Sequence, residues 1–194
     1  GMCQSLNNNK AGDDTTVLAI KIREQETINL FTGPPKDPDN DYAIIENILN
    51  SEGKVIVCGG TTANIVARTL GCEVEIDMST MTPTIPPIGK IPRIELVTEG
   101  VITINKALEL IKWYNSPEFN NKLLKLLREN NGASRLASLL IEDCDNLNIW
   151  LGQAVNPAHQ EASFPMGFDF KTGQIKELAS WLEKMGKVVT IHYI

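Results

Sequence analysis

The sequence predicts an α/β fold in which a mainly parallel sheet is flanked by helices. Strand-like and helix-like segments alternate from residue 27 to the C-terminus, which is the pattern of parallel strands joined by helical crossovers. The segments KVIVC (54–58) and IELVT (94–98) are apolar runs typical of strands buried on both faces. With 42% hydrophobic residues, the 194-residue chain can bury a sizeable core. The predicted architecture is therefore Rossmann-like, with a β-hairpin at its N-terminal end.

The predicted hairpin covers residues 14–32. TTVLAIKI and TINLFT are rich in β-branched residues, and Arg23, Glu24 and Gln25 form the turn between them. Residues 1–12 are small and polar, so we expect a flexible lead-in. The loop TGPPKDPDND excludes regular structure because proline lacks an N–H donor and restricts its neighbour. We place the domain boundary after residue 26, with a single α/β domain over residues 27–194.

The remaining segments continue the alternation. Helical periodicity is found at residues 42–49, 63–71, 102–114, 133–144 and 174–186. Further strands are expected at residues 54–58, 74–76, 94–98, 147–152 and 187–194. Ser116, which is followed by a proline, is expected to cap a helix over residues 116–130. The direction of the last strand stays open, because parallel and antiparallel strands share the same local pattern.

Charge and cysteine spacing exclude several function classes. The chain has 18 Lys+Arg against 24 Asp+Glu, and a net charge of -6 disfavours binding to a phosphate backbone. The apolar runs are too short for a membrane span, and no secretory leader is found, so we expect a soluble, cytoplasmic protein. The cysteines lack the close spacing of a zinc site, and we expect buried free thiols at Cys3, Cys58, Cys72 and Cys144.

The sharpest local pattern is VIVCGGTTANIVARTLG, in which a buried strand, two glycines, two threonines and a helix follow one another. Gly59 and Gly60 allow a ligand to approach the backbone, and the amides of the next helix attract an anion. The segment lacks the lysine of GxxxxGK[ST] and the third glycine of GxGxxG, so neither nucleotide-binding fingerprint is met. We expect a small-ligand site at Gly59, Gly60, Thr61 and Thr62, with a helix cap at either threonine as the purely structural alternative.

Two other polar groups follow predicted strands. Glu99 comes directly after a buried strand, where its carboxylate either binds a ligand or caps the next helix. Asn156 and His159 lie in the loop GQAVNPAHQ, and a hydrogen-bonded loop histidine is the alternative to a catalytic base. Because parallel strands end at the same edge of a sheet, we expect these residues to share one crevice with the Gly59–Gly60 turn.

Adjacent carboxylates stand at the start of TTVLAIKI. Asp13 and Asp14 are the kind of ligand that Mg²⁺ or Mn²⁺ prefers, although two carboxylates are too few to hold such an ion. A turn with two solvated aspartates is the alternative.

Several of these motifs together resemble a known family. GDDTTVLAIKI resembles the last conserved strand of metal-dependent PPM-type serine/threonine phosphatases, where an Asp-Asp/Asn-x-Thr motif supplies a metal ligand. LFTGPPKDPDND, KVIVCGGTTANIVARTLG, IPPIGKI, ELVTEGVITINKALELI and GQAVNPAHQ resemble the segment appended to the catalytic domain in relatives of the sporulation stage II protein E phosphatase. The likeness to the appended segment covers nearly all of residues 27–194, and the likeness to the phosphatase core covers about residues 11–23.

The resemblance implies a role for the N-terminal residues. Asp13 matches the metal-binding aspartate of the family, so residues 1–26 would hold the remnant of the last phosphatase strand. Mg²⁺ or Mn²⁺ is implied as the cofactor of a longer phosphatase parent. The acidic residues on earlier strands that complete the bridged metal pair have no counterpart in this sequence, so we expect no phosphatase activity from the chain in isolation.

The leading functional hypothesis is therefore a C-terminal accessory or regulatory module of a PPM-type phosphatase that binds a small anionic ligand. One alternative is a stand-alone enzyme acting on a phosphorylated or nucleotide-like substrate. A second alternative is a scaffold for dimerisation or partner docking. The expected partners are the ligand and an attached or associated phosphatase domain, with a homodimer left open and with neither nucleic acid nor membrane.

Overall fold

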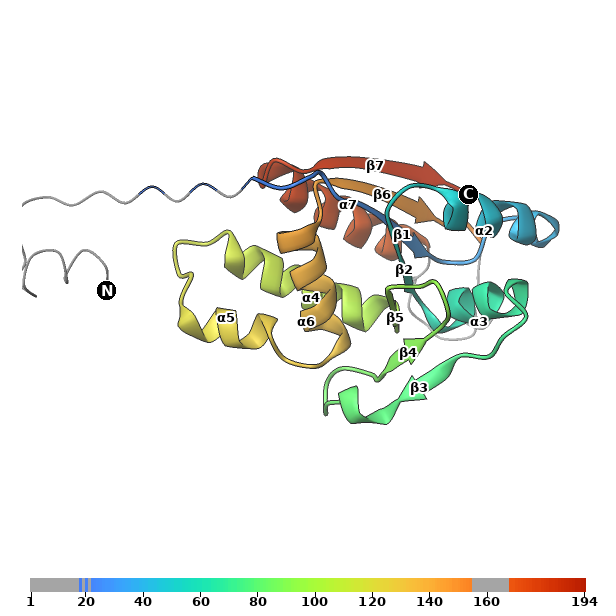
Figure 1. The fold of residues 1–194 in the computed structure, drawn as a ribbon, viewed down its shortest axis with the longest axis horizontal. Helices are drawn as coiled ribbons and strands as arrows, with labels where there is room; N and C mark the ends of the chain where they lie inside the picture. Colours follow the sequence, from blue (N-terminus) through green and yellow to red (C-terminus); the bar gives the residue numbers. More distant parts are fainter. Residues whose placement is uncertain (1–17, 19, 21, 155–167) are drawn as a thin grey trace, which may run out of the picture.

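The computed structural model describes residues 18, 20, 22–154 and 168–194, and helices cover both faces of its seven-stranded sheet (Figure 1). The strands are β1 (Thr27–Thr32), β2 (Lys54–Cys58), β3 (Glu75–Asp77), β4 (Ile88–Lys90), β5 (Leu96–Thr98), β6 (Asn146–Leu151) and β7 (Val188–Tyr193). The α-helices are α2 (Asp41–Asn50), α3 (Gly60–Thr69), α4 (Val101–Tyr114), α5 (Asn121–Leu127), α6 (Gly132–Ser138) and α7 (Phe168–Lys184). A π-helix over Leu139–Asp143 continues α6. The predicted α/β fold is confirmed.

The sheet has the strand order β3-β4-β5-β2-β1-β6-β7. Strands β5, β2, β1, β6 and β7 run parallel to one another, whereas β4 is antiparallel to both β5 and the edge strand β3. The last strand, whose direction the sequence left open, therefore runs parallel to β6. Because five neighbouring strands are parallel, their carboxyl ends lie along one edge of the sheet.

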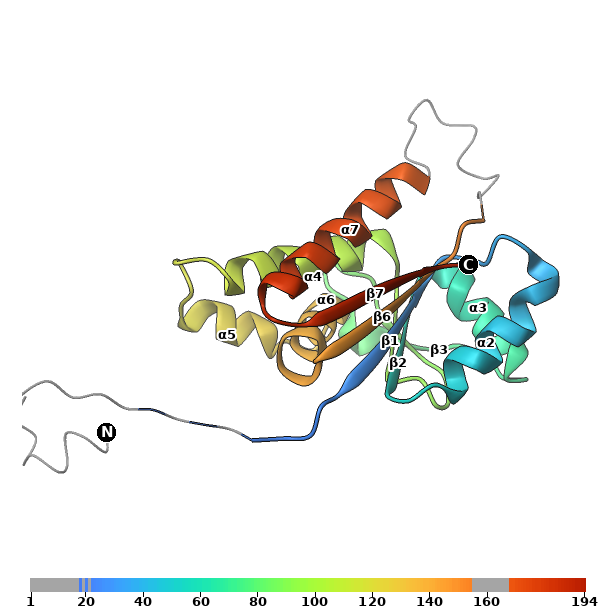
Figure 2. The same cartoon turned by 90° about the horizontal axis from the view of Figure 1, so that it is seen from above.

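The helices that connect the strands form two groups, one on each face of the sheet. Helix α2, which connects β1 to β2, and helix α3, which follows β2, cover one face, and α4, α6 and α7 cover the other (Figure 2). The chain moves outward from β1 to β5 and then returns to the centre to form β6 beside β1. The loops that leave β1 and β6 therefore diverge, which makes this position the topological switch point where open α/β sheets bind ligands.

Each face of the sheet has its own hydrophobic core. The core under α4, α6 and α7 includes Leu30, Ile56 and Ile149, and none of these three side chains is exposed to solvent. The core under α2 and α3 includes Phe31 and Val57, the neighbours of two of these residues. This alternation is the period of two that places successive side chains on opposite faces. Burial on both faces explains why β2 is a continuous apolar run.

The structure shows the second strand of the predicted hairpin but not the hairpin itself. Residues 27–32 form β1, whose two hydrogen-bonding edges are occupied by β2 and β6, both in parallel register. No edge of β1 is left for residues 14–23. The β-branched composition identified β1 correctly as a strand. Its partners are β2 and β6, and not the segment that directly precedes it in the sequence. Most of the expected first strand lies outside the described residues.

Two smaller predictions are also corrected. Helix α5 begins at Asn121 and not at Ser116, because the Asn120 side chain accepts hydrogen bonds from the N–H groups of Lys122 (2.9 Å) and Leu123 (3.3 Å). The Ser116 hydroxyl donates instead to the carbonyl oxygen of Trp113 (2.8 Å), so it closes the end of α4. The sequence predicted no strand between residues 76 and 94, yet this proline-rich stretch contains the short strand β4.

Candidate functional site

Three parallel strands end in a row of small polar side chains. Thr32 of β1 pairs with Cys58 of β2, and Cys58 pairs with Thr98 of β5. Cys58 belongs to the core under α4 and α7, so this row faces those helices. The Thr98 hydroxyl oxygen lies 2.8 Å from the carbonyl oxygen of Glu99 and 3.3 Å from the Cys58 sulfur. On the face covered by α4 and α7, the apolar core therefore gives way to polar side chains at the carboxyl edge of the sheet.

The Gly59–Thr62 segment forms the start of helix α3. Gly59 adopts a left-handed φ of 124°, and its N–H donates to the carbonyl oxygen of Thr98 (2.8 Å). Gly60 is the first residue of the helix, its φ is outside the left-handed region, and a side chain placed there would meet no atom within 4 Å. The first turn of α3 thus opens on unoccupied space at Gly60.

The two threonines of this segment act differently from a helix cap. No side-chain hydrogen bond caps α3, and Thr61 is exposed. Thr62 is buried, and its hydroxyl accepts a hydrogen bond from the N–H of Gly33 (2.9 Å), directly after β1. Thr62 therefore joins the first turn of α3 to the loop at the switch point.

Glu99 caps helix α4. Its Oε2 accepts hydrogen bonds from the N–H groups of Ile102 (3.0 Å) and Thr103 (3.3 Å), which have no partners inside the helix. A side chain at the next residue, Gly100, would lie 3.4 Å from Cα of Gly59. The turns after β2 and β5 are thus in contact, as parallel strands require, but the Glu99 carboxylate is engaged by its own helix.

Lys171 is a site residue that sequence reasoning missed. It comes from the first part of α7, and its Nζ lies so close to Gly33 that a side chain at Gly33 would overlap it. Burial lowers the pKa of Lys171 from 10.5 to about 8, and the nearby Cys58 opposes this shift. The helix predicted from the sequence begins at residue 174, so it does not include Lys171. Only the longer observed helix brings its amine to the edge of the sheet.

Thr32 adds a buried hydroxyl to the same place. Its side chain is fully buried, and its Oγ1 has no hydrogen-bond partner among the residues that the structure describes. Thr32 lies beside Gly33 in sequence and beside Cys58 in the sheet, on the face that α7 covers. A buried hydroxyl without a partner costs free energy, which a bound ligand or water would recover.

Cys58 is not a nucleophile at neutral pH. Burial raises the pKa of its thiol to about 12, so the reactive thiolate is not populated. The prediction of buried free thiols is confirmed for Cys58 and Cys144, whereas Cys72 is only partly buried. Cys3 lies outside the described residues.

Three of the predicted site residues cannot be placed. Asn156, His159 and Asp13 lie outside the described residues. The loop that carries the first two begins at the same edge, because the N–H of Ala154 donates to the carbonyl oxygen of Pro34 (3.2 Å). Within the described part of the chain, no three His, Cys, Asp or Glu side chains gather as a metal site would require.

The switch point offers a lysine amine, a threonine hydroxyl without a partner among the described residues, and the first N–H groups of a helix that starts beside two glycines. Such groups are suited to hold an anion, and no described nucleophile or carboxylate pair accompanies them. Among the described helices, none is long and apolar enough to cross a membrane. No protein-family model, curated protein or solved structure matches this chain.

Proposed function

We propose that this chain is an accessory module that binds a small anionic ligand at the carboxyl edge of its sheet and regulates an attached PPM-type phosphatase. The observation that carries the binding proposal is the position of Lys171, whose amine lies against Gly33 at the switch point. Lys171 is partly buried, and the part of the cost of burying an ammonium group that this incurs is offset when an anion accompanies it. The same position in open α/β sheets is where ligands bind.

The start of α3 supports an anion as the ligand. The N–H groups of Gly60, Thr61 and Thr62 precede the first intrahelical bond, which runs from the N–H of Ala63 to the carbonyl oxygen of Gly59 (2.8 Å). These amides and the helix dipole favour a negative group such as a phosphate or a carboxylate. Because Gly60 has no side chain, such a group can approach the backbone closely.

The N-terminal segment supports attachment to a larger protein. Leu18, Ile20 and Ile22 occupy alternate positions in the sequence, and 80%, 75% and 93% of their surfaces are exposed. Apolar residues with a period of two are typical of a strand whose face is buried by a sheet. This pattern is what the remnant of a phosphatase strand would show in the absence of its domain.

A stand-alone enzyme that acts on a phosphorylated or nucleotide-like substrate is the second candidate. The lowered pKa of Lys171, about 8, favours it, because a group with such a pKa can exchange a proton near neutral pH. The raised pKa of Cys58 removes the thiol as a nucleophile, so Lys171 would be the acid or base.

The binding proposal is tested by thermal unfolding with inorganic phosphate and with pyrophosphate. A ligand that binds only the folded chain raises Tm, by about 2–4 °C for each 1 kcal/mol in a protein of this size. We expect pyrophosphate to raise the Tm of the wild type. Gly60→Val fills the approach to α3 and Lys171→Met removes the cation, so each variant is expected to lose this rise.

Gly173→Val is the matched control for Gly60→Val. Gly173 lies in α7, and a side chain placed there would also meet no atom within 4 Å. Both substitutions thus introduce a β-branched residue into an open helical position, and Gly173→Val should keep the full response to pyrophosphate. A Tm that neither anion raises, or an equal rise in wild type and Gly60→Val, would contradict the proposed site.

A further inference from the structure

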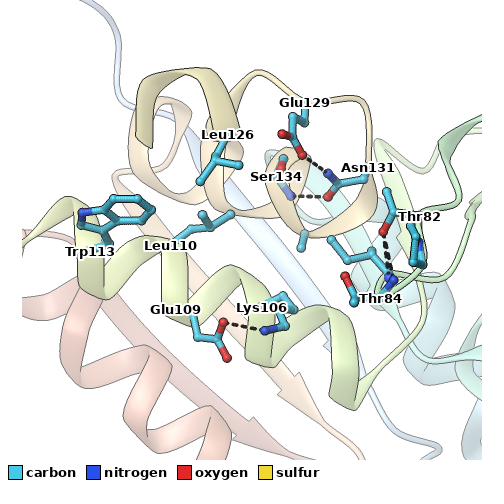
Figure 3. Close-up of a pocket in the computed structure, with 13 residues that line it drawn as sticks. Thr82, Thr84, Lys106, Glu109, Leu110, Trp113, Leu126, Glu129, Asn131 and Ser134 are labelled. Carbon is cyan, nitrogen blue, oxygen red and sulfur yellow. Dashed lines mark hydrogen bonds and ion pairs between the residues drawn. The ribbon is translucent and has the colours of Figure 1, made fainter. Parts of the chain in front are cut away.

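A cavity lies away from the carboxyl edge. It has a volume of about 440 Å³, is partly open to solvent, and is lined by α4, the α5–α6 corner and the loop before β4 (Figure 3). This volume falls in the range of about 300–1,000 Å³ that small-molecule sites occupy. One wall is the face of α4 that carries Lys106, Glu109, Leu110 and Trp113, residues spaced to lie together on a helix. None of its lining residues belongs to the carboxyl-edge site.

The walls of this cavity are held in place by hydrogen bonds. In the loop, the N–H of Thr82 donates to the carbonyl oxygen of Ile85 (3.0 Å), and the N–H of Ile85 donates to the Thr82 hydroxyl (3.0 Å). On the opposite side, Asn131 is 2% exposed, and its Oδ1 accepts a hydrogen bond from the N–H of Ser134 (3.0 Å). The cavity is therefore formed before any ligand arrives.

The cavity is apolar at one end. Trp113, Leu110 and Leu126 gather there, while Thr82, Thr84 and Asn131 lie at the other end (Figure 3). The Nζ of Lys122, which does not line the cavity, lies 6.0 Å from the centre of the Trp113 ring at this apolar end. An aromatic ring fits best between an indole and two leucines, because it gains both burial and ring contact.

The polar groups of the cavity carry one net negative charge. Lys106 pairs with Oε2 of Glu109 (2.8 Å), so these two charges offset each other. Oε2 of Glu129 accepts a hydrogen bond from the Asn131 amide (3.2 Å), which leaves the charge of Glu129 in place. The Oε1 atoms of Glu109 and Glu129 have no hydrogen-bond partner among the described residues. Two free carboxylate oxygens accept hydrogen bonds, and a primary ammonium group supplies three donors and a positive charge.

We infer that this cavity binds a small primary amine with an aromatic body. The ring lies against Trp113 and the leucines, and the ammonium group lies toward Glu129, whose charge Lys106 does not offset. This ligand has the opposite charge to the one proposed at the carboxyl edge, so the two sites take different molecules, and the inference stands independently of the proposed function.

The test uses three probes with one phenyl ring and different head groups: phenethylamine, 2-phenylethanol and 3-phenylpropionate. Binding is followed by NMR through the indole N–H of Trp113, which donates to the carbonyl oxygen of Glu118 (3.1 Å) and is assigned with a Trp113→Phe variant. We expect phenethylamine to shift this signal and to bind about tenfold more tightly than 3-phenylpropionate, because one head group is attracted by the carboxylates and the other is repelled. The neutral alcohol should fall between them.

Two charge-reversal variants distinguish the effect of a carboxylate in the cavity from the effect of the net charge of the protein. Glu129 and Glu183 are both exposed, so Glu129→Lys and Glu183→Lys change the net charge equally and should both fold. Glu129→Lys is expected to abolish the tenfold preference for the amine, and Glu183→Lys, on α7, should retain it. The inference is overturned if no probe shifts the Trp113 signal, or if 3-phenylpropionate binds as tightly as phenethylamine to the wild type.

Discussion

The partly buried amine of Lys171 links the stability of the protein to pH. Its pKa is lowered from 10.5 to about 8 because burial disfavours the charged form. Below pH 8 the amine is charged in both the folded and the unfolded chain, so the cost of burying the charge is fully present. Between pH 8 and 10.5 the unfolded chain binds a proton that the folded chain does not. This group therefore makes the free energy of unfolding rise with pH across that window.

We predict that Lys171→Met removes this contribution. Urea unfolding at pH 7 and at pH 9.5 should show a wild-type free energy of unfolding that rises by about 1–2 kcal/mol more than that of the variant, an amount that follows from the pKa difference after allowing for partial exposure. Lys176→Met, an exposed position on the same helix, is the control and should behave as the wild type does. Equal pH dependence in wild type and Lys171→Met would show that the amine is not the source.

At the scale of the elements, the start of α4 depends on one carboxylate. Glu99 satisfies two N–H groups of the first helical turn, at 3.0 Å and 3.3 Å, and its negative charge lies at the positive end of the helix dipole. Residue 100, which precedes the helix, is a glycine without a capping side chain. The sequence alternatives for Glu99 were a ligand contact and a helix cap, and this geometry favours the cap.

We predict that Glu99→Ala lowers the free energy of unfolding by about 0.5–2 kcal/mol, the usual cost of losing a helix cap. Glu99→Gln should lose less, because its amide oxygen still accepts the two hydrogen bonds. Chemical denaturation measures both. In neither variant should the rise of Tm with pyrophosphate disappear, and a variant that keeps its stability but loses that response would make Glu99 a ligand contact after all.

At the scale of the whole molecule, the N-terminal segment around residues 18–22 exposes apolar side chains to solvent. Leu18, Ile20 and Ile22 are largely exposed, and the segment extends away from the helices and the sheet (Figure 2). The link to the sheet follows at Arg23, whose guanidinium forms two hydrogen bonds with Asp145 (2.5 and 2.8 Å). Exposed apolar side chains in an extended strand favour association with another chain.

We predict that replacing Leu18, Ile20 and Ile22 together by serine changes the free energy of unfolding by less than about 0.5 kcal/mol, the usual range for exposed positions. The same variant should associate less at high concentration. Urea unfolding and light scattering measure the two effects. A loss of stability above about 1 kcal/mol would mean that the segment packs on the rest of the chain.

The hydrophobic pattern of the sequence was sufficient to predict most helices and strands, because their formation depends largely on residues that are close together in the chain. The apolar run before Gly59 identifies β2, and the periodicity of residues 102–114 identifies α4 within one residue of its observed start at Val101. The alternation of these elements was enough to predict the α/β class and to place the Gly59 and Glu99 turns on one edge. The same reasoning failed at Ser116. Serine and asparagine both suit a helix cap, and the residue that caps α5 is Asn120.

Long-range packing decided the partners of the strands and the composition of the site. The pairing of β1 with β2 and β6, the parallel direction of β7, the hydrogen bond from Gly33 to Thr62 and the position of Lys171 beside Gly33 all join residues far apart in sequence. Periodicity carries no information about such pairs, because it records only which face of an element is apolar. The sequence by itself therefore determined the elements, the fold class and the edge where a site would form. Only the tertiary structure decided which side chains meet there, because that depends on how helices and strands pack across the whole sheet.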